Sequence, residues 1–162
     1  MRPTLRRAAA WLAGAWAGVV GAIGFVAAPT LFATLPRADA GRVAARLFAV
    51  DATIGVCAGA LLLLLTFQLA RRAAEEGASR FSTDMLLVLG ALFCIIAGHY
   101  ALQPVMEARL RGEPGASFAV LHGVASAFFL VKFLAVAALA WRLTGAPRAA
   151  ADAAATAAAP SS

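Results

Sequence analysis

Four apolar runs divide the chain, at residues 8–28, 47–70, 84–103 and 118–141, and short polar segments separate them. Each run has 20 to 24 residues. At about 1.5 Å per residue, a helix of ~20 residues crosses the roughly 30 Å hydrocarbon core of a bilayer. The pattern therefore predicts an all-α, integral membrane four-helix bundle in residues 1–144, with the lipid bilayer as its surroundings.

The polar segments carry signals for helix ends. Pro36 is the predicted end of the first helix, and Asp39 is placed to cap the second. Ser82 or Thr83 is placed to cap the third helix, and Pro104 is predicted to end or bend it. The spans are thus predicted to be separate helices joined by short turns.

The two ends of the chain are read differently from the spans. A basic start followed by an apolar run also describes a secretory signal, but the first run is longer than the 7 to 15 residues of such a signal. We therefore interpret it as a span. Residues 145–162 are Ala-rich and of low complexity, which predicts a disordered tail.

Small residues recur along the first run, where Gly14, Gly18 and Gly21 follow small-xxx-small spacing. Such spacing lets a neighbouring helix approach closely. We expect this face to pack within the bundle, with a homo-oligomer contact as the alternative; the sequence names no protein partner.

Composition and charge refine the location. Hydrophobic residues make up 62% and charged residues only 14% of the chain, far from the roughly 25% charged residues of soluble proteins. The net charge of +6 does not predict nucleic-acid binding, because the arginines cluster between the apolar runs. Eight arginines would lie on the side of the N-terminus and five on the other, so both termini are predicted to be cytoplasmic. The Ala- and Arg-rich composition favours a bacterial inner membrane.

Two stretches resemble a known family. The segment GFVAAPTLFATLPRADAGRVAARLF, residues 24–48, and Leu121-His122-Gly123 with Ser126 are similar to motifs of the four-span membrane family built on the domain of unknown function 4149. Eukaryotic transmembrane protein 205 is similar, and a weaker similarity links the chain to copper-resistance membrane proteins of the CopD type. The resemblance covers residues 8–142 and implies a multi-pass membrane protein without a settled biochemical activity.

Polar side chains inside the runs are the candidate site. An ionisable group in hydrocarbon costs about 2.5 to 3.5 kcal/mol on insertion scales. With span boundaries at Leu47, Gln103 and Phe118, each of three groups lies four residues inside the membrane, which predicts a polar cluster at one depth near the outer face. The three groups are Asp51, His99 and His122.

Several roles remain open for this cluster. Asp51 can pair with Arg46 or form a polar clasp between helices, and the histidines can hydrogen-bond across helices, His99 with support from Gln103. The functional alternatives are a transition-metal site, a haem held by His99 and His122, and a proton or solute relay. Neither the metal nor the cofactor is identified by the sequence.

The fourth run carries the single lysine. Lys132 lies in the inner half of the run, where we expect it to extend toward the cytoplasmic face and meet Asp84; a transport role is the alternative. Ser126 follows His122 by four residues, but no catalytic motif accompanies it. We therefore expect a non-enzymatic membrane or stress-related accessory protein, with a metal- or haem-binding protein or a small transport component as alternatives.

Overall fold

The computed structural model describes residues 2–75 and 82–157, and every element in these ranges is a helix. Along the chain, the elements are α1 (Arg2–Gly21), η1 (Ala22–Ala27), α2 (Ala28–Thr34), α3 (Arg37–Ala74), α4 (Thr83–Ile95), η2 (Ile96–Ala101), α5 (Leu102–Leu110) and α6 (Phe118–Ala157). The two η elements are π-helical turns within continuous helices. The predicted all-α class is confirmed.

Four of the resulting helices are long and apolar enough to cross a membrane: Thr4–Thr34, Arg37–Ala74, Thr83–Arg109 and Phe118–Gly145. Much of their surface is apolar, and large side chains such as Leu64, Phe93 and Leu134 are more than half exposed. A four-span pattern with such a surface is that of a multi-pass membrane protein.

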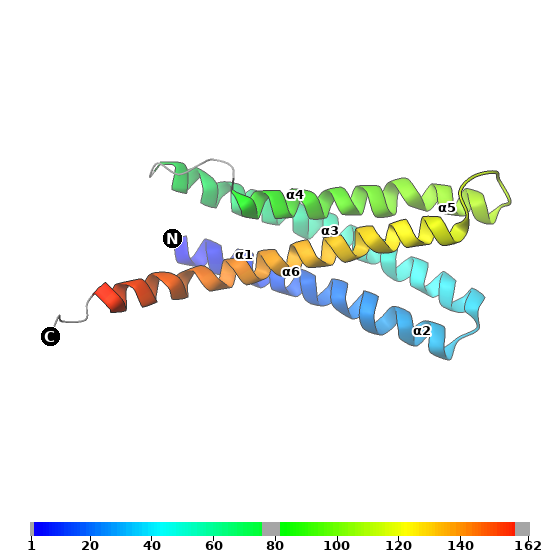
Figure 1. Cartoon of the computed structure of the whole chain (residues 1–162), viewed down its shortest axis with the longest axis horizontal. Coiled ribbons are helices and arrows are strands. Elements are labelled where there is room, and N and C mark those ends of the chain that lie inside the picture. Colours follow the sequence, from blue (N-terminus) through cyan, green and yellow to red (C-terminus); the bar gives the residue numbers. More distant parts are fainter. Residues whose placement is uncertain (1, 76–81, 158–162) are drawn as a thin grey trace.

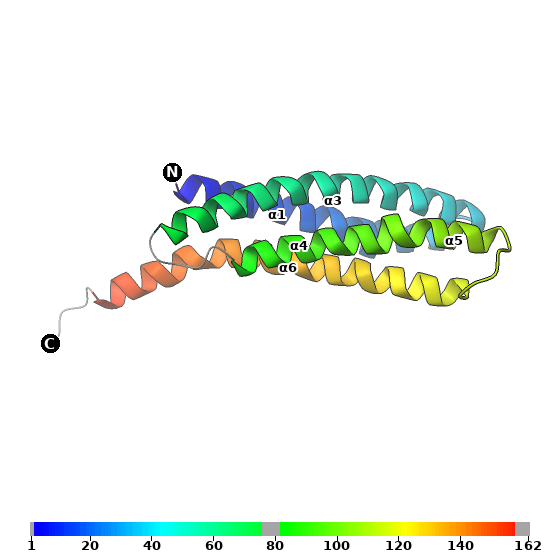
Figure 2. The same cartoon turned by 90° about the horizontal axis from the view of Figure 1, so that it is seen from above.

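The helices form two antiparallel hairpins that pack against each other. One hairpin contains α1, η1, α2 and α3, and the other contains α4, η2, α5 and α6 (Figures 1 and 2). Helix α1 contacts α3 and α6, and helix α4 contacts the same two helices. Helices α3 and α6 therefore lie diagonally across the bundle.

The bundle has two distinct ends. Helix α1 begins and α6 ends at one end, which we call the terminal end; α2 and α5 lie at the other, the loop end (Figure 1). At the terminal end, the Arg6 guanidinium donates hydrogen bonds to the carbonyl oxygens of Leu143 at 3.0 Å and Arg142 at 2.9 Å. Asp84 at the start of α4 accepts a hydrogen bond of 2.7 Å from Arg142.

The apolar core occupies the middle and the terminal half of the bundle. Its largest fully buried side chains include Trp16, Leu62, Val88 and Leu139, one from each of the four long helices. Toward the loop end, η1, α2 and η2 contain no buried residue. Close packing between the two hairpins therefore reaches η1, where Gly24 meets Phe129 of α6, but does not extend to α2, which contacts neither α5 nor α6.

Helix ends depart from the predictions in several places. Helix α3 begins at Arg37 with Pro36 as its N-cap, and Asp39 lies inside the first turn, where it pairs with Arg42 instead of capping. The Ser82 side chain does cap α4, accepting a hydrogen bond of 3.2 Å from the backbone N–H of Met85. Pro104 does not end the third span, because the helix continues through α5 to Leu110.

The last helix also differs from the expectation, because α6 continues as far as Ala157, beyond the end of the apolar run. The alanines of residues 145–157 have the highest intrinsic helix propensity, so a helix already formed in the span propagates into them. Residues 158–162 lie outside the described part of the chain.

Among the glycines of the first span, Gly21 and Gly24 closely approach α6, whereas Gly14 and Gly18 do not. A Cβ at Gly21 would lie 3.2 Å from the Phe133 ring, whereas no described atom would lie within 4 Å of a Cβ at Gly14 or Gly18. The predicted small-residue packing face is therefore incorrect for Gly14 and Gly18.

Candidate functional site

A buried ion pair lies at the centre of the bundle. Lys132 Nζ of α6 donates a hydrogen bond to Asp51 Oδ2 of α3, and the two residues are only 5% and 2% exposed. We call these two residues the central ion pair. Because α3 and α6 are diagonal partners, the pair crosses the middle of the bundle and connects its two hairpins.

The lengths of the two helices explain why these residues meet. Asp51 lies fourteen residues after the start of α3, and Lys132 lies fourteen residues after the start of α6. Both helices begin at the loop end, so both side chains lie roughly 21 Å along their helices. The pair is therefore at mid-depth in the bundle and not near one face.

This pairing corrects the prediction for Lys132. We expected it to meet Asp84, but Asp84 pairs with Arg142 at the terminal end. Of the two structural roles considered for Asp51, the clasp between helices is the observed one, and its partner is Lys132 rather than Arg46. Helix α3 begins ten residues before Leu47, the predicted boundary of the span, so Asp51 lies deeper than predicted and at the level of Lys132.

Aromatic rings enclose the ion pair on the side of the loop end. The Lys132 ammonium lies 4.6 Å from the centroid of the Phe129 ring, a cation–π contact. Phe129 in turn packs edge-to-face against Phe48 of α3, with ring centroids 5.4 Å apart. These contacts reduce the cost of placing an ammonium group in an apolar bundle.

The structure places His99 at the level of the central ion pair. Gly55 of α3 packs against Ile95 of α4, and these helices are antiparallel. Asp51 is one turn before Gly55 and His99 is one turn after Ile95, so both lie one turn nearer the loop end. His99 is half-buried, and its ring makes an edge contact of 5.1 Å with Tyr100.

His122 lies apart from this level. It is four residues from the start of α6, about 6 Å along the helix, and therefore ten residues from Lys132. Its side chain is exposed and its ring stacks on Phe118 with centroids 5.9 Å apart. The predicted common depth therefore describes Asp51 and His99 but not His122.

The supporting residues are also dispersed. Gln103 Nε2 donates a hydrogen bond of 3.3 Å to Glu107 on its own helix, and Ser126 is exposed on α6. Among the described residues, no three His, Cys, Asp or Glu side chains are grouped so that they could hold a metal ion. The two cysteines differ in exposure: Cys57 is exposed and Cys94 is buried.

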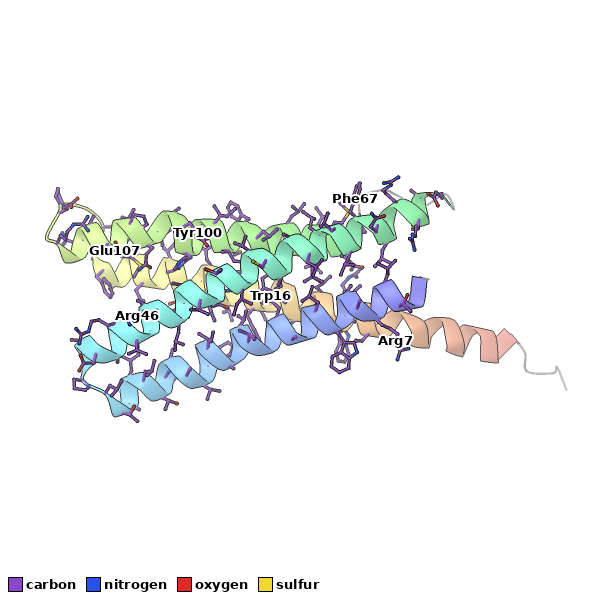
Figure 3. The ribbon with its side chains drawn as sticks, turned by 180° about the vertical axis from the view of Figure 1, so that it is seen from behind. Arg7, Trp16, Arg46, Phe67, Tyr100 and Glu107 are labelled. Atoms are coloured by element: carbon purple, nitrogen blue, oxygen red, sulfur yellow. The ribbon has the colours of Figure 1, made fainter. Side chains whose placement is uncertain are left out.

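Two features of the centre are not predicted from the sequence: the buried position of Trp16 and the pairing of Asp51 with Lys132. Trp16 of α1 is 2% exposed and lies near the middle of the bundle (Figure 3), although its apolar run gave no sign of a polar role. The pairing of Asp51 with Lys132 did have a signal, because they are the only acidic and the only basic residue deep within their respective runs. Opposite charges inside two spans favour pairing with each other.

Comparison with known proteins identifies the family. Residues 11–113 match the family model described as "Domain of unknown function (DUF4149)", and the chain belongs to this family. The match contains Asp51 and His99 but ends before Lys132. The sequence matches no curated protein and no solved structure.

Proposed function

We propose that this protein is a non-enzymatic accessory protein of the bacterial inner membrane, with a stress-related role and with the terminal end of the bundle in the cytoplasm. The central ion pair is the observation that carries the proposal. The two deepest charges are used to hold the hairpins together, and the histidines face different surroundings instead of converging on a substrate or cofactor.

The surface supports a membrane location. Trp11 and Trp141 are 79% and 80% exposed, and both lie close to the Arg6 contact at the terminal end. Exposed tryptophans collect at membrane–water interfaces, and arginines collect on the cytoplasmic side. We further propose that the likeness to transmembrane protein 205 and to CopD-type proteins reflects a shared four-span architecture.

A direct test is the visible spectrum and metal content of the protein purified in detergent. An accessory protein without a prosthetic group is expected to be colourless and to contain no stoichiometric metal. A Soret band or one equivalent of metal that is lost in both His99→Ala and His122→Ala would overturn the proposal and favour the cofactor-binding class.

A second candidate function, a proton relay within a small transport component, is favoured by one specific observation. His99 lies at the level of the central ion pair, so three titratable groups share one layer of the bundle. Chains of Asp, Lys and His in membranes are typical of proton pathways.

Proteoliposomes that contain a pH-sensitive dye test this candidate. After a membrane potential is imposed, a relay is expected to acidify the lumen faster in wild type than in the double variant Asp51→Leu/Lys132→Leu. Equal rates in the two samples and in empty liposomes would exclude the relay and leave the accessory role.

A further inference from the structure

Two buried polar atoms at the centre of the bundle have no hydrogen-bond partner among the described residues: Trp16 Nε1 and Asp51 Oδ1. Other buried polar groups are satisfied; the Thr66 hydroxyl, for example, donates to the carbonyl oxygen of Leu62 at 2.8 Å. Leaving a buried donor or acceptor unpaired costs about 1–3 kcal/mol. Two such atoms in one region therefore indicate a missing partner.

The two atoms belong to the same region of the core. A Cβ at Gly55 would lie 3.4 Å from Trp16 Nε1, so the indole N–H lies against the face of α3 that carries Gly55. Asp51 is one turn away on that same face, and residues four apart on a helix have Cβ positions about 5–6 Å apart. The donor and the acceptor are thus close enough for small molecules to connect them.

The charges around the two atoms select the ligand. A cation would be repelled by the Lys132 ammonium and by the indole N–H, and an anion would be repelled by the Asp51 carboxylate. A neutral molecule that both accepts and donates hydrogen bonds fits all three groups. Water is the smallest such molecule, and buried water typically makes two to four hydrogen bonds of this kind.

We propose that internal water occupies the centre of the bundle, accepting a hydrogen bond from Trp16 Nε1 and donating one to Asp51 Oδ1. The water hydrates the free side of the central ion pair. This proposal does not depend on a transport role, because the two unpaired buried atoms need a hydrogen-bond partner in an accessory protein as well.

The packing also indicates the route by which water enters. On the terminal side, Leu62, Val88, Val136 and Leu139 are at most 1% exposed and form a dry core. On the loop side, α2 contacts α3 but neither α5 nor α6, and it lies far from α5 in Figure 1. His99 is half-buried at the level of the pair. The water therefore exchanges from the loop side, at the level of the half-buried His99 and beside the paired rings of Phe48 and Phe129, which cover part of the ion pair there.

Nuclear magnetic resonance of the indole N–H group tests the site. In the background Trp11→Phe/Trp141→Phe, Trp16 is the single tryptophan. We expect magnetisation transfer between its Hε1 proton and water, together with slow exchange in deuterium oxide because the indole is buried. In the matched background Trp11→Phe/Trp16→Phe, the exposed indole of Trp141 is expected to exchange fast.

The variant Asp51→Leu removes the acceptor and, made together with Lys132→Leu, leaves no unpaired charge. The water transfer at Trp16 is expected to be lost in this double variant, while the remaining backbone spectrum shows that the fold persists. A Trp16 proton without transfer from water in the starting background, or one whose transfer is unchanged in the double variant, would overturn the proposal.

The route is tested by thiol labelling in membranes of known orientation, in the background Cys57→Ser/Cys94→Ala. We expect His99→Cys to react with a charged, membrane-impermeant reagent added at the loop end and not at the terminal end. Ile96→Cys is the control, because Ile96 is 58% exposed one turn away on the same helix and faces the apolar surroundings. If His99→Cys is as unreactive as Ile96→Cys, or reacts from the terminal end, the proposed route is wrong.

Discussion

At the scale of single residues, the central ion pair resolves the problem that each of its charges would pose alone. Asp51 and Lys132 lie in apolar runs of different helices, and either one unpaired would be strongly disfavoured. Their pairing does not imply high stability, because desolvation offsets most of the attraction between two buried charges. Its structural effect is to fix which faces of α3 and α6 point toward each other across the bundle.

We predict that breaking the pair is more harmful than removing it. In Asp51→Leu, Lys132 remains buried without a counter-charge, and we expect a loss of about 3–5 kcal/mol in unfolding free energy. In Asp51→Leu/Lys132→Leu, the stability should return to near the wild-type value or above it. Thermal unfolding in one detergent, followed by circular dichroism, measures both variants.

The pair of Asp84 with Arg142 provides the matched control. It also connects two helices, but its side chains are 21% and 49% exposed, so Asp84→Asn should cost less than about 1 kcal/mol. Equal melting temperatures for Asp51→Leu and the double variant would show that the buried ion pair does not form in solution.

At the scale of elements, two π-helical turns precede the two prolines within spans. Pro29 follows η1, and Pro104 follows η2. A proline ring clashes with the carbonyl group four residues earlier, here that of Phe25 and that of Tyr100, and both of these lie in the π-helical turns. The wider turn accommodates the clash, so each helix continues instead of ending.

The π-helical turns also contain glycines that allow α6 to approach. A Cβ at Gly24 would lie 2.3 Å from Phe129 Cε1, and one at Gly98 would lie 2.7 Å from Phe128 Cβ. The aromatic pair of α6 is thus held between η1 and η2, one turn from Lys132. The first and third spans therefore pack against the same part of α6, one turn from the central ion pair toward the loop end.

We predict that Gly98→Ala destabilises the protein although alanine is the better helix former. The new methyl group would meet the Cβ of Phe128, which is fixed to the backbone of α6, so the helices must shift at a cost of about 1–3 kcal/mol. Thermal unfolding in detergent measures the loss.

Gly90→Ala on α4 is the control for that substitution, because no described atom lies within 4 Å of the added Cβ. It should stabilise the protein by up to about 1 kcal/mol through helix propensity alone. If both variants raise the melting temperature, the close contact between η2 and α6 is not present in solution.

At the scale of the whole molecule, the sequence predicted the four spans well and the relation between them poorly. Apolar runs of about 20 residues report where helices cross, and the structure has a candidate span at each. They do not report where helices begin, and α3 starts ten residues before its run. The depth of Asp51, and therefore its partner, depended on that start. The buried position of Trp16 required knowledge of which helix faces meet.

The opening of the hairpins at the loop end could not be derived from periodicity either. Pro29 and Pro104, which follow η1 and η2, indicate where the first and third spans can bend but not in which direction. The whole molecule is thus closed and dry at the terminal end and loosely packed at the loop end. The orientation of the bundle in the membrane therefore determines from which side water reaches the central ion pair.

We predict that the loop end faces away from the cytoplasm. Eight arginines lie toward the terminal end and five toward the loop end in the sequence, and positive charge is retained on the cytoplasmic side. A fluorescent protein fused after Glu75 should fold in the cytoplasm, and alkaline phosphatase should be active when fused after Glu113 and inactive after Glu75. If alkaline phosphatase is active at both positions, or inactive at both, the four-span topology is excluded. If it is active after Glu75 and inactive after Glu113, the terminal end is not cytoplasmic. The expected result places the water route to the central ion pair on the outer face of the membrane, because the hairpins part only at the loop end.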